Sequence, residues 1–149
     1  MNGTIIEFMQ KQSTATICCI DELGKPYCFS CFYVYNIDVA LLYFKSASTS
    51  HHARLMNKNL FVAGTILPDK LNTLGIKGVQ FEAIVLNANN PLAKTAAVHY
   101  FKKNPLAVAL SGDVWTIQIN QIKMTDCTLG FGKKLSWKRD EAGFCFNNK

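Results

Sequence analysis

Hydrophobic and polar residues alternate along much of this chain, and the alternation predicts short β-strands separated by turns. Strands are expected over residues 14–20, 27–35, 39–46, 59–67, 75–86, 115–119 and 122–128, followed by a last strand that reaches Trp137. Apolar residues recur with helical spacing over residues 3–12, 50–58, 91–102 and 104–110. Thr4 is the expected cap of the first helix, Ser50 or Thr49 caps the second, and Pro91 opens the third.

This order of elements predicts a mainly β protein. Hairpin turns join most strands and the helices fall between or outside them, which is typical of a closed or nearly closed antiparallel barrel. We expect six to seven strands with three or four short helices. A chain of 149 residues is expected to form a single domain over 1–149, with a loose tail over about 140–149.

Polar residues of a particular chemistry gather where the expected strand 39–46 meets the expected helix 50–58. The segment reads Lys45-Ser46-Ala47-Ser48-Thr49-Ser50-His51-His52-Ala53-Arg54. The first backbone N–H groups of a helix lack intrahelical partners and the helix dipole favours negative charge there. Hydroxyls and cations at this junction therefore predict an anion site, with phosphate as the natural ligand. An ordinary capped helix would explain the hydroxyls, but it would need neither histidine.

Composition narrows the class of partner without naming it. The chain has 16 Lys and Arg residues against 10 Asp and Glu, a net charge of +6 that favours anionic partners. Its 49% hydrophobic and 17% charged residues are ordinary for a globular protein. The first residues do not have the pattern of a secretion signal, and no apolar run approaches the ~18 residues of a membrane span. A cytoplasmic protein without membrane contact is therefore expected.

The six cysteines do not form a convincing ligand set. Cys28 and Cys31 have ligand-like spacing, but side chains three apart in a strand point to opposite faces, and no second pair completes four ligands. Adjacent histidines on a helix diverge by about 100°, so a zinc site at His51 and His52 is not expected. We expect reduced, buried cysteines and no metal.

Two further places are candidates for lining a ligand site. The turn Gly130-Phe131-Gly132-Lys133-Lys134 lacks the Walker spacing but allows a backbone to approach a ligand closely, although a hairpin with exposed lysines has the same composition. Gln80 and Trp115 each lie in an expected strand and could form a partly polar pocket wall, although tryptophan is more often core. The chain has no G-x-S-x-G motif and no paired carboxylates, and a bound cofactor would fit this absence of catalytic side chains.

A resemblance that covers about residues 3–139 rests on three short segments. Two are Lys77-Gly78-Val79-Gln80-Phe81 and the stretch 125–134; the third, Ser50-His51-His52-Ala53, matches a phosphate signature of the form S-[RK]-K-A after a strand. On these residues the chain resembles the pyridoxamine 5'-phosphate oxidase-like, FMN-binding split-barrel superfamily, and more narrowly the small bacterial YhbP-type proteins. It departs from the superfamily at Phe29-Ser30-Cys31, which stands where an arginine is usual in the second strand.

The resemblance implies a homodimeric split barrel with FMN at the subunit interface, and a flavin-dependent oxidoreductase that passes electrons between a reduced nicotinamide, NAD(P)H, and a small molecule. The residues implied for the cofactor are Lys45, Ser46, Ser50, His51, His52, Gln80 and Trp115, and those for the substrate are Lys133 and Lys134. One alternative is a binding module that keeps the barrel without flavin and holds another anionic ligand or haem. A third, less favoured, is nucleic-acid binding through the basic run 133–139, which would require affinity that falls steeply with salt.

Overall fold

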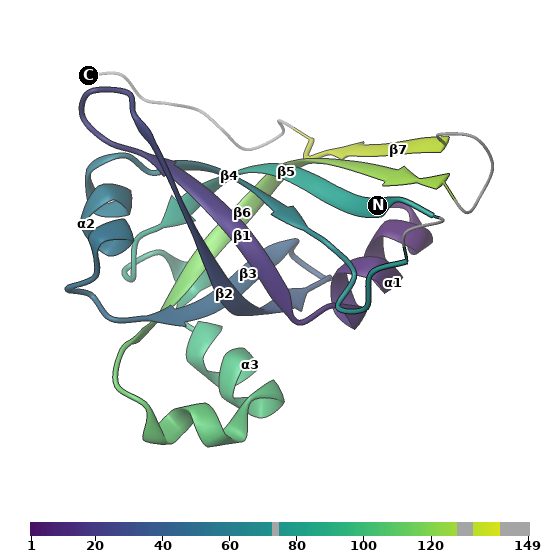
Figure 1. Ribbon diagram of the computed structural model, residues 1–149. Coiled ribbons are helices and arrows are strands. Elements are labelled where there is room, and N and C mark those ends of the chain that lie inside the picture. Colours follow the sequence, from purple (N-terminus) through teal and green to yellow (C-terminus); the bar gives the residue numbers. More distant parts are fainter. Residues whose placement is uncertain (73–74, 128–132, 141–149) are drawn as a thin grey trace.

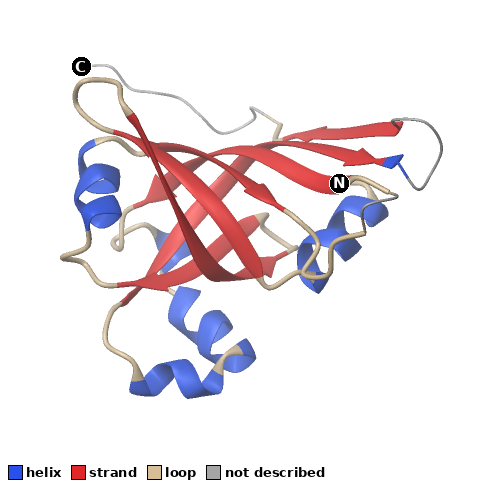
Figure 2. Ribbon diagram, in the orientation of Figure 1, coloured by secondary structure: helices blue, strands red, loops and turns tan. Residues whose placement is uncertain are grey.

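The structure is a computed structural model that describes residues 1–72, 75–127 and 133–140. Its helices and strands, in chain order, are α1 (Gly3–Lys11), β1 (Thr14–Ile20), β2 (Pro26–Asn36), β3 (Leu41–Ser46), α2 (His51–Lys58), β4 (Phe61–Ile66), β5 (Lys77–Leu86), η1 (Pro91–Ala93), α3 (Ala96–Lys103), η2 (Pro105–Ala109), β6 (Asp113–Asp126) and β7 (Lys133–Lys138). The strands cross the centre of the molecule and the helices lie around them (Figure 1, Figure 2). The glycine turn at 130–132 and the expected tail beyond Asp140 lie outside the described residues.

The described strands form one antiparallel sheet that closes into a barrel. The strand order is β3-β2-β1-β4-β5-β6-β7, and β3 also pairs with β6, which joins the two ends of the six-stranded part. The seventh strand, β7, extends the sheet beyond the barrel along β6. The predicted mainly β fold, an antiparallel split barrel with flanking helices, is confirmed.

The long strand β6 changes its inward-facing residues halfway along. Glu82 of β5 lies opposite Gln121, but Ala83 lies opposite Ile119, so one residue of β6 is extra and forms a β-bulge. Ile117 and Ile119 are fully buried before the bulge, and Ile122 and Met124 are fully buried after it. The expected strands 115–119 and 122–128 are therefore one strand, and their separation was wrong.

Two helices close the barrel and a third lies on its outside. The apolar faces of α1 and α2 join the core inside the barrel. Outside, α3 packs Ala96 and Tyr100 against Val34, Leu41 and Tyr43 of β2 and β3. The end of β3 therefore lies between α2 on one side and the segment α3–η2 on the other.

Two helix boundaries differ from the expectation. Asn2, not Thr4, caps α1, because the Asn2 side chain accepts a hydrogen bond from the Thr4 backbone N–H at 2.8 Å. The expected helix 91–102 is divided into η1 and α3, with Thr95 between them at φ −97° and ψ 2°. Ala96 and Tyr100, one turn apart in α3, both face the barrel.

Candidate functional site

The predicted anion cluster forms where β3 ends and α2 begins. Ser46 is the last residue of β3, and its Oγ lies 2.5 Å from Nε2 of His52 in the first turn of α2. Ser50 caps the helix by accepting from the Ala53 backbone N–H at 3.3 Å, and its Oγ also lies 3.3 Å from the Ser46 Oγ. The N-terminus of α2 therefore brings together Ser46, Ser50 and His52. The backbone N–H groups in the first turn of a helix have no intrahelical acceptor.

Both histidines of α2 contact aromatic rings of β2, and these two rings were not among the predicted site residues. The His52 ring stacks on Phe29 with centroids 3.8 Å apart and planes 11° from parallel. The His51 ring meets Tyr27 at 4.7 Å and 84°, an edge-to-face contact. Tyr27 and Phe29 are two apart in a strand and project from one face, so their alternation was a signal that could have identified them.

The environment of His52 favours its neutral form. Partial burial, and secondly the charge of His51, lower the pKa of His52. At neutral pH the ring is therefore mostly uncharged and acts as the hydrogen-bond partner of Ser46. A phosphate placed against the ring would favour the protonated form, because opposite charges stabilise each other at short range.

Lys45 projects from the other face of β3, toward η2. Its ammonium group donates to the backbone carbonyl of Ala107 at 2.7 Å and to that of Leu110, and it lies 5.1 Å from the centre of the Phe101 ring. These two carbonyls use two of the three N–H donors of the ammonium. Lys45 thus fastens the η2 segment beside the cluster.

A pocket of about 270 Å³ joins these elements. Its polar groups come from β2, β3, α2 and the residues after η2, and its apolar wall comes from β2, α3 and η2. The lining residues are Phe29, Ser30, Cys31, Phe32, Lys45, Ser46, His52, Tyr100, Ala107, Leu110 and Ser111. Pockets for small molecules are typically ~300–1,000 Å³, so the volume of this pocket lies just below that range.

The two other residues predicted for the cofactor lie in different places. Trp115 adjoins the cluster, since its Nε1 donates to the Ser46 carbonyl at 3.4 Å, and it lines a neighbouring pocket of about 310 Å³. Gln80 lines a groove of about 480 Å³ on the outer face of the sheet. Gln80 is six residues along β5 from Leu86, which pairs with Thr116, so roughly 20 Å of strand separates it from the cluster.

The lysines predicted for the substrate lie farther away within one chain. Lys133 and Lys134 pair with Asp126 and Thr125 at the far end of β6. Thr125 is ten residues from Trp115, a separation of roughly 30 Å along the strand. The structure therefore brings neither lysine to the cluster of the same chain.

One cation of the basic run 133–139 is bound within the fold. The guanidinium of Arg139 donates to the backbone carbonyls of Ile119 at 3.0 Å, Val39 at 2.8 Å and Ala40 at 3.0 Å. Burial lowers the pKa of Arg139. These three contacts connect the residue after β7 to β6 and to the turn before β3, so Arg139 has a structural role.

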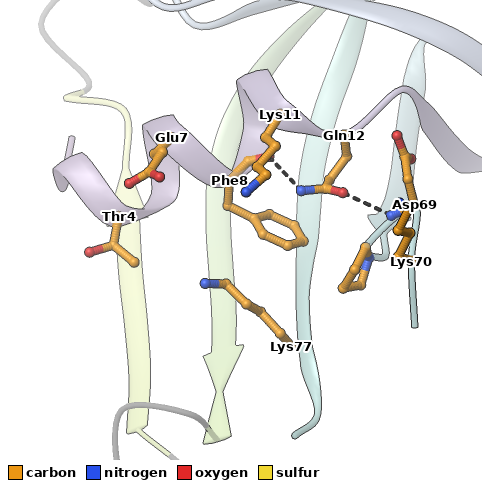
Figure 3. A pocket seen from close by; sticks show the side chains of 9 residues that line it. Thr4, Glu7, Phe8, Lys11, Gln12, Asp69, Lys70 and Lys77 are labelled. Atoms are coloured by element: carbon orange, nitrogen blue, oxygen red, sulfur yellow. Dashed lines mark hydrogen bonds between the residues drawn. The ribbon is translucent and has the colours of Figure 1, made fainter. Parts of the chain in front are cut away.

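A larger pocket, of about 590 Å³, lies between α1 and the residues that follow β4 (Figure 3). The Gln12 side chain bridges the two segments, donating to the Phe8 carbonyl at 3.5 Å and accepting from the Asp69 N–H at 2.8 Å. Lys77 pairs with the buried carboxylate of Asp126 at 2.9 Å and lies over the Phe8 ring. These polar groups hold α1 against the barrel, so we assign them a structural role and not a role in ligand binding.

Among the described cysteines, the expectation of burial is confirmed for Cys19 alone. Cys28 is exposed, and Cys18, Cys31 and Cys127 are half-buried, with Cys31 packed against the core. Cys28 and Cys31 do point to opposite faces of β2. Among the described residues, no three His, Cys, Asp or Glu side chains are grouped to hold a metal ion.

Sequence relatives decide the family. A UPF0306 protein of Photorhabdus laumondii is 35% identical to this chain over 144 residues, covering 93% of this chain and 100% of that protein. The chain belongs to the UPF0306 family. The UPF0306 protein YhbP of Shigella sonnei is 33% identical over 137 residues and is covered to 92%, which confirms the resemblance to YhbP-type proteins. No protein-family model matches the chain.

Solved structures share the fold at low sequence identity. A haem binding protein from Mycobacterium smegmatis superposes with a TM-score of 0.74 at 12% identity, over 93% of this chain and 59% of that one. A pyridoxamine 5'-phosphate oxidase-related, FMN binding protein from Nostoc punctiforme superposes with a TM-score of 0.67 at 10% identity, over 95% and 91%. The UPF0306 chain thus has the pyridoxamine 5'-phosphate oxidase-like split-barrel fold. In the described ranges, no helix has the length and apolar character needed to cross a membrane.

Proposed function

We propose that this protein binds FMN, with the cofactor's phosphate at the cluster of Ser46, Ser50 and His52. The observation that carries the proposal is the contact of two hydroxyls and an imidazole at the start of α2, beside a pocket with aromatic walls. The hydroxyls would donate to phosphate oxygens, as would the first-turn N–H groups of α2. His52 would contribute positive charge once protonated, and Lys45 supplies charge from the other wall of the pocket.

The size of the pocket supports a site shared by two copies of the chain. About 270 Å³ accommodates a phosphate and a polyol chain but not a three-ring flavin as well. We therefore propose a homodimer in which the flavin ring lies between subunits, with Trp115 near it. Gln80, Lys133 and Lys134 would reach the cofactor or substrate only from the partner copy, because they lie away from the pocket of their own chain.

In this proposal the protein is an oxidoreductase with a reduced nicotinamide as electron donor and a small molecule as acceptor. Bound FMN would supply the redox chemistry. The chain's own residues have simpler tasks: Ser46, Ser50 and His52 bind and orient the phosphate, and Phe29 and Tyr100 exclude water from the pocket.

The test is a titration of the purified protein with FMN, followed by flavin fluorescence and by the melting temperature. We expect saturable quenching and a melting temperature that rises with FMN concentration. Ser46→Ala should weaken both effects. The matched control is Thr4→Ala, which also removes one hydroxyl but lies on α1, at the opposite end of the barrel from α2, and should change neither (Figure 1). Absence of saturable binding by the wild-type protein at millimolar FMN would reject the proposal.

A second candidate ligand is haem, and the state of His52 is the observation that favours it. A half-buried neutral imidazole beside the Phe29 ring is the form of histidine that coordinates iron. The Mycobacterium structure with the same fold is named as a haem binding protein. Haem titration would give a Soret band that His51→Gln or His52→Gln alters, whereas an unchanged spectrum of free haem would remove this candidate.

A further inference from the structure

We propose that Cys18 and Cys28 form a redox-active pair that closes into a cross-strand disulfide by exchange with a low-molecular-weight disulfide. The pair lies on the outer face of the hairpin formed by β1 and β2. It uses none of the residues assigned to the cofactor, so the inference goes beyond the proposed function.

The register of the hairpin places the two cysteines directly opposite each other. Two backbone hydrogen bonds, from Asp21 N to Lys25 O and from Tyr33 N to Ser13 O, both 3.0 Å, identify hydrogen-bonded residue pairs at the two ends of the hairpin. Hydrogen-bonded and non-hydrogen-bonded pairs alternate along an antiparallel hairpin. By this alternation Cys18 and Cys28 form a non-hydrogen-bonded pair. Opposite Cα atoms in such pairs are about 4.5 Å apart, within the range that a disulfide spans.

The next non-hydrogen-bonded pair shows how close such side chains come. Thr16 and Ser30 lie two residues away on the same face, and their side-chain oxygens are 3.2 Å apart. Cys18 and Cys28 occupy the equivalent cross-strand positions two residues farther along the hairpin. Burial first, and then the proximity of Cys28, raises the pKa of Cys18. The two thiols are thus neighbours on one face of the hairpin before any oxidation.

Access distinguishes this pair from the other described cysteines. Cys28 is exposed, and with Cys18 it lines the groove of about 480 Å³ on the outer face of the sheet. Cys31, by contrast, packs against the core, and burial raises its pKa to about 12, which suppresses the reactive thiolate. Cys28, the exposed member of the pair, is therefore the attacking residue, and the half-buried Cys18 is the resolving one.

The exchange balances with two thiols and one small disulfide. The Cys28 thiolate attacks a sulfur of the small disulfide, and the first leaving thiolate takes up a proton. Cys18 then attacks the mixed disulfide at the Cys28 sulfur, forming the Sγ–Sγ bond and releasing the second small thiol. The protein loses two hydrogen atoms, and the small disulfide is reduced to two thiols.

The disulfide would act on the neighbouring histidines through β2. Cys28 lies between Tyr27, which contacts His51, and Phe29, which stacks on His52. The tip of the hairpin also reaches α2, since Glu22 and Lys58 form an ion pair at 2.9 Å (Figure 1). A bond that changes the local twist of the hairpin would therefore change the environment of both rings.

Peptide mapping tests the disulfide itself. The reduced full chain is treated with oxidised glutathione, alkylated, and cut after Glu22, because trypsin cuts poorly at Lys25 before Pro26. We expect two peptides joined by Cys18 and Cys28 that separate on reduction. Cys18→Ser should instead leave glutathione bound to Cys28, and Cys127→Ser, the matched control, should still form the bond. A link that persists in Cys18→Ser, or a wild-type protein that keeps the glutathione adduct, would overturn the proposal.

Nuclear magnetic resonance of the histidine rings tests the coupling without any cofactor. Oxidation should move the ring signals of His51 and His52 but leave those of His99, which stacks on Tyr43 on the other side of β3. Unchanged signals from all three rings would reject the coupling. Because no FMN is present, this result does not depend on whether FMN binds.

Discussion

The ring of His52 lies flat on the ring of Phe29 while its Nε2 is held 2.5 Å from the Ser46 hydroxyl. The face and the edge of the imidazole are thus fixed by different strands, β2 and β3. A ligand that binds this ring does not have to order it first, which preserves affinity. His52 is therefore the side chain on which binding at the cluster should depend most.

Replacing this imidazole tests that dependence. His52→Gln removes the stacking, the fixed hydrogen bond and the positive charge, and we expect FMN to bind about tenfold more weakly, a loss of about 1.4 kcal/mol. The measurement is a fluorescence titration of each purified variant. His99→Gln is the matched control, since it also removes a stacked ring but lies on α3. An equal loss of FMN affinity in both variants would mean that the affinity depends on ring stacking in general and not on the cluster of Ser46, Ser50 and His52.

The affinity for FMN should rise as the pH falls from about 8 to about 6. In the free protein, partial burial and then the charge of His51 lower the pKa of His52, so the ring is neutral at the start of this range. Bound phosphate favours the protonated ring, so binding takes up a proton. The range ends near pH 6, where the phosphate itself begins to be protonated. Titrations at several pH values should show this slope in the wild type and a flatter one in His52→Gln.

The same lowered pKa predicts an effect of the opposite sign on the free protein. Near pH 6 the folded chain binds fewer protons at His52 than the unfolded chain, whose histidines titrate near pH 6.5. The contribution of His52 to stability is therefore present above this pH and is lost as the pH falls. Urea unfolding at pH 7.5 and pH 5.5 should show a smaller loss for His52→Gln than for the wild type, and equal losses would contradict the prediction.

The sequence indicated the junction of β3 and α2 because hydroxyls, histidines and a helix start are adjacent in the chain. The alternation in β2 indicated that Tyr27 and Phe29 share a face, but it could not indicate that the two histidines lie against their rings, since the packing of α2 on β2 brings them together. Nor could the sequence show that Gln80 faces away from the cluster. Contacts between distant segments are set by strand register, which a single sequence does not display.

The strand β6 shows a second kind of limit. Inward residues have odd numbers before the bulge and even numbers after it, as Ile119 and Ile122 illustrate. When the alternation of apolar and polar residues changes phase within one strand, the sequence has the pattern of two strands with a break between them. The barrel was nevertheless predictable, because the alternation of buried and exposed residues keeps one phase throughout β1, β4 and β5.

Arg139 should stabilise the fold through its three carbonyl contacts. Arg139→Ala leaves the carbonyls of Val39, Ala40 and Ile119 without this donor, and we expect the free energy of unfolding to fall by about 2–3 kcal/mol. Arg139→Lys should retain little of this stability, since an ammonium group cannot reproduce the planar, forked arrangement of donors in a guanidinium. Urea unfolding measures both. Lys134→Ala, at an exposed position of the same strand, should stay within about 0.5 kcal/mol of the wild type.

Gly64 should tolerate no side chain, because the barrel wall is closed around it. A Cβ at this position would lie 2.7 Å from the Thr16 carbonyl of the adjoining strand and even closer to the Phe81 ring. We expect Gly64→Ala to lower the free energy of unfolding by about 1–3 kcal/mol. Adding Phe81→Leu should recover only part of this, since the Thr16 carbonyl belongs to the backbone of β1 and cannot move aside. Gly3→Ala is the matched control: no atom lies within 4 Å of its Cβ, so thermal unfolding should show no loss of stability. A Gly64→Ala protein as stable as the Gly3→Ala protein would contradict the close approach of β1 and β5 to Gly64.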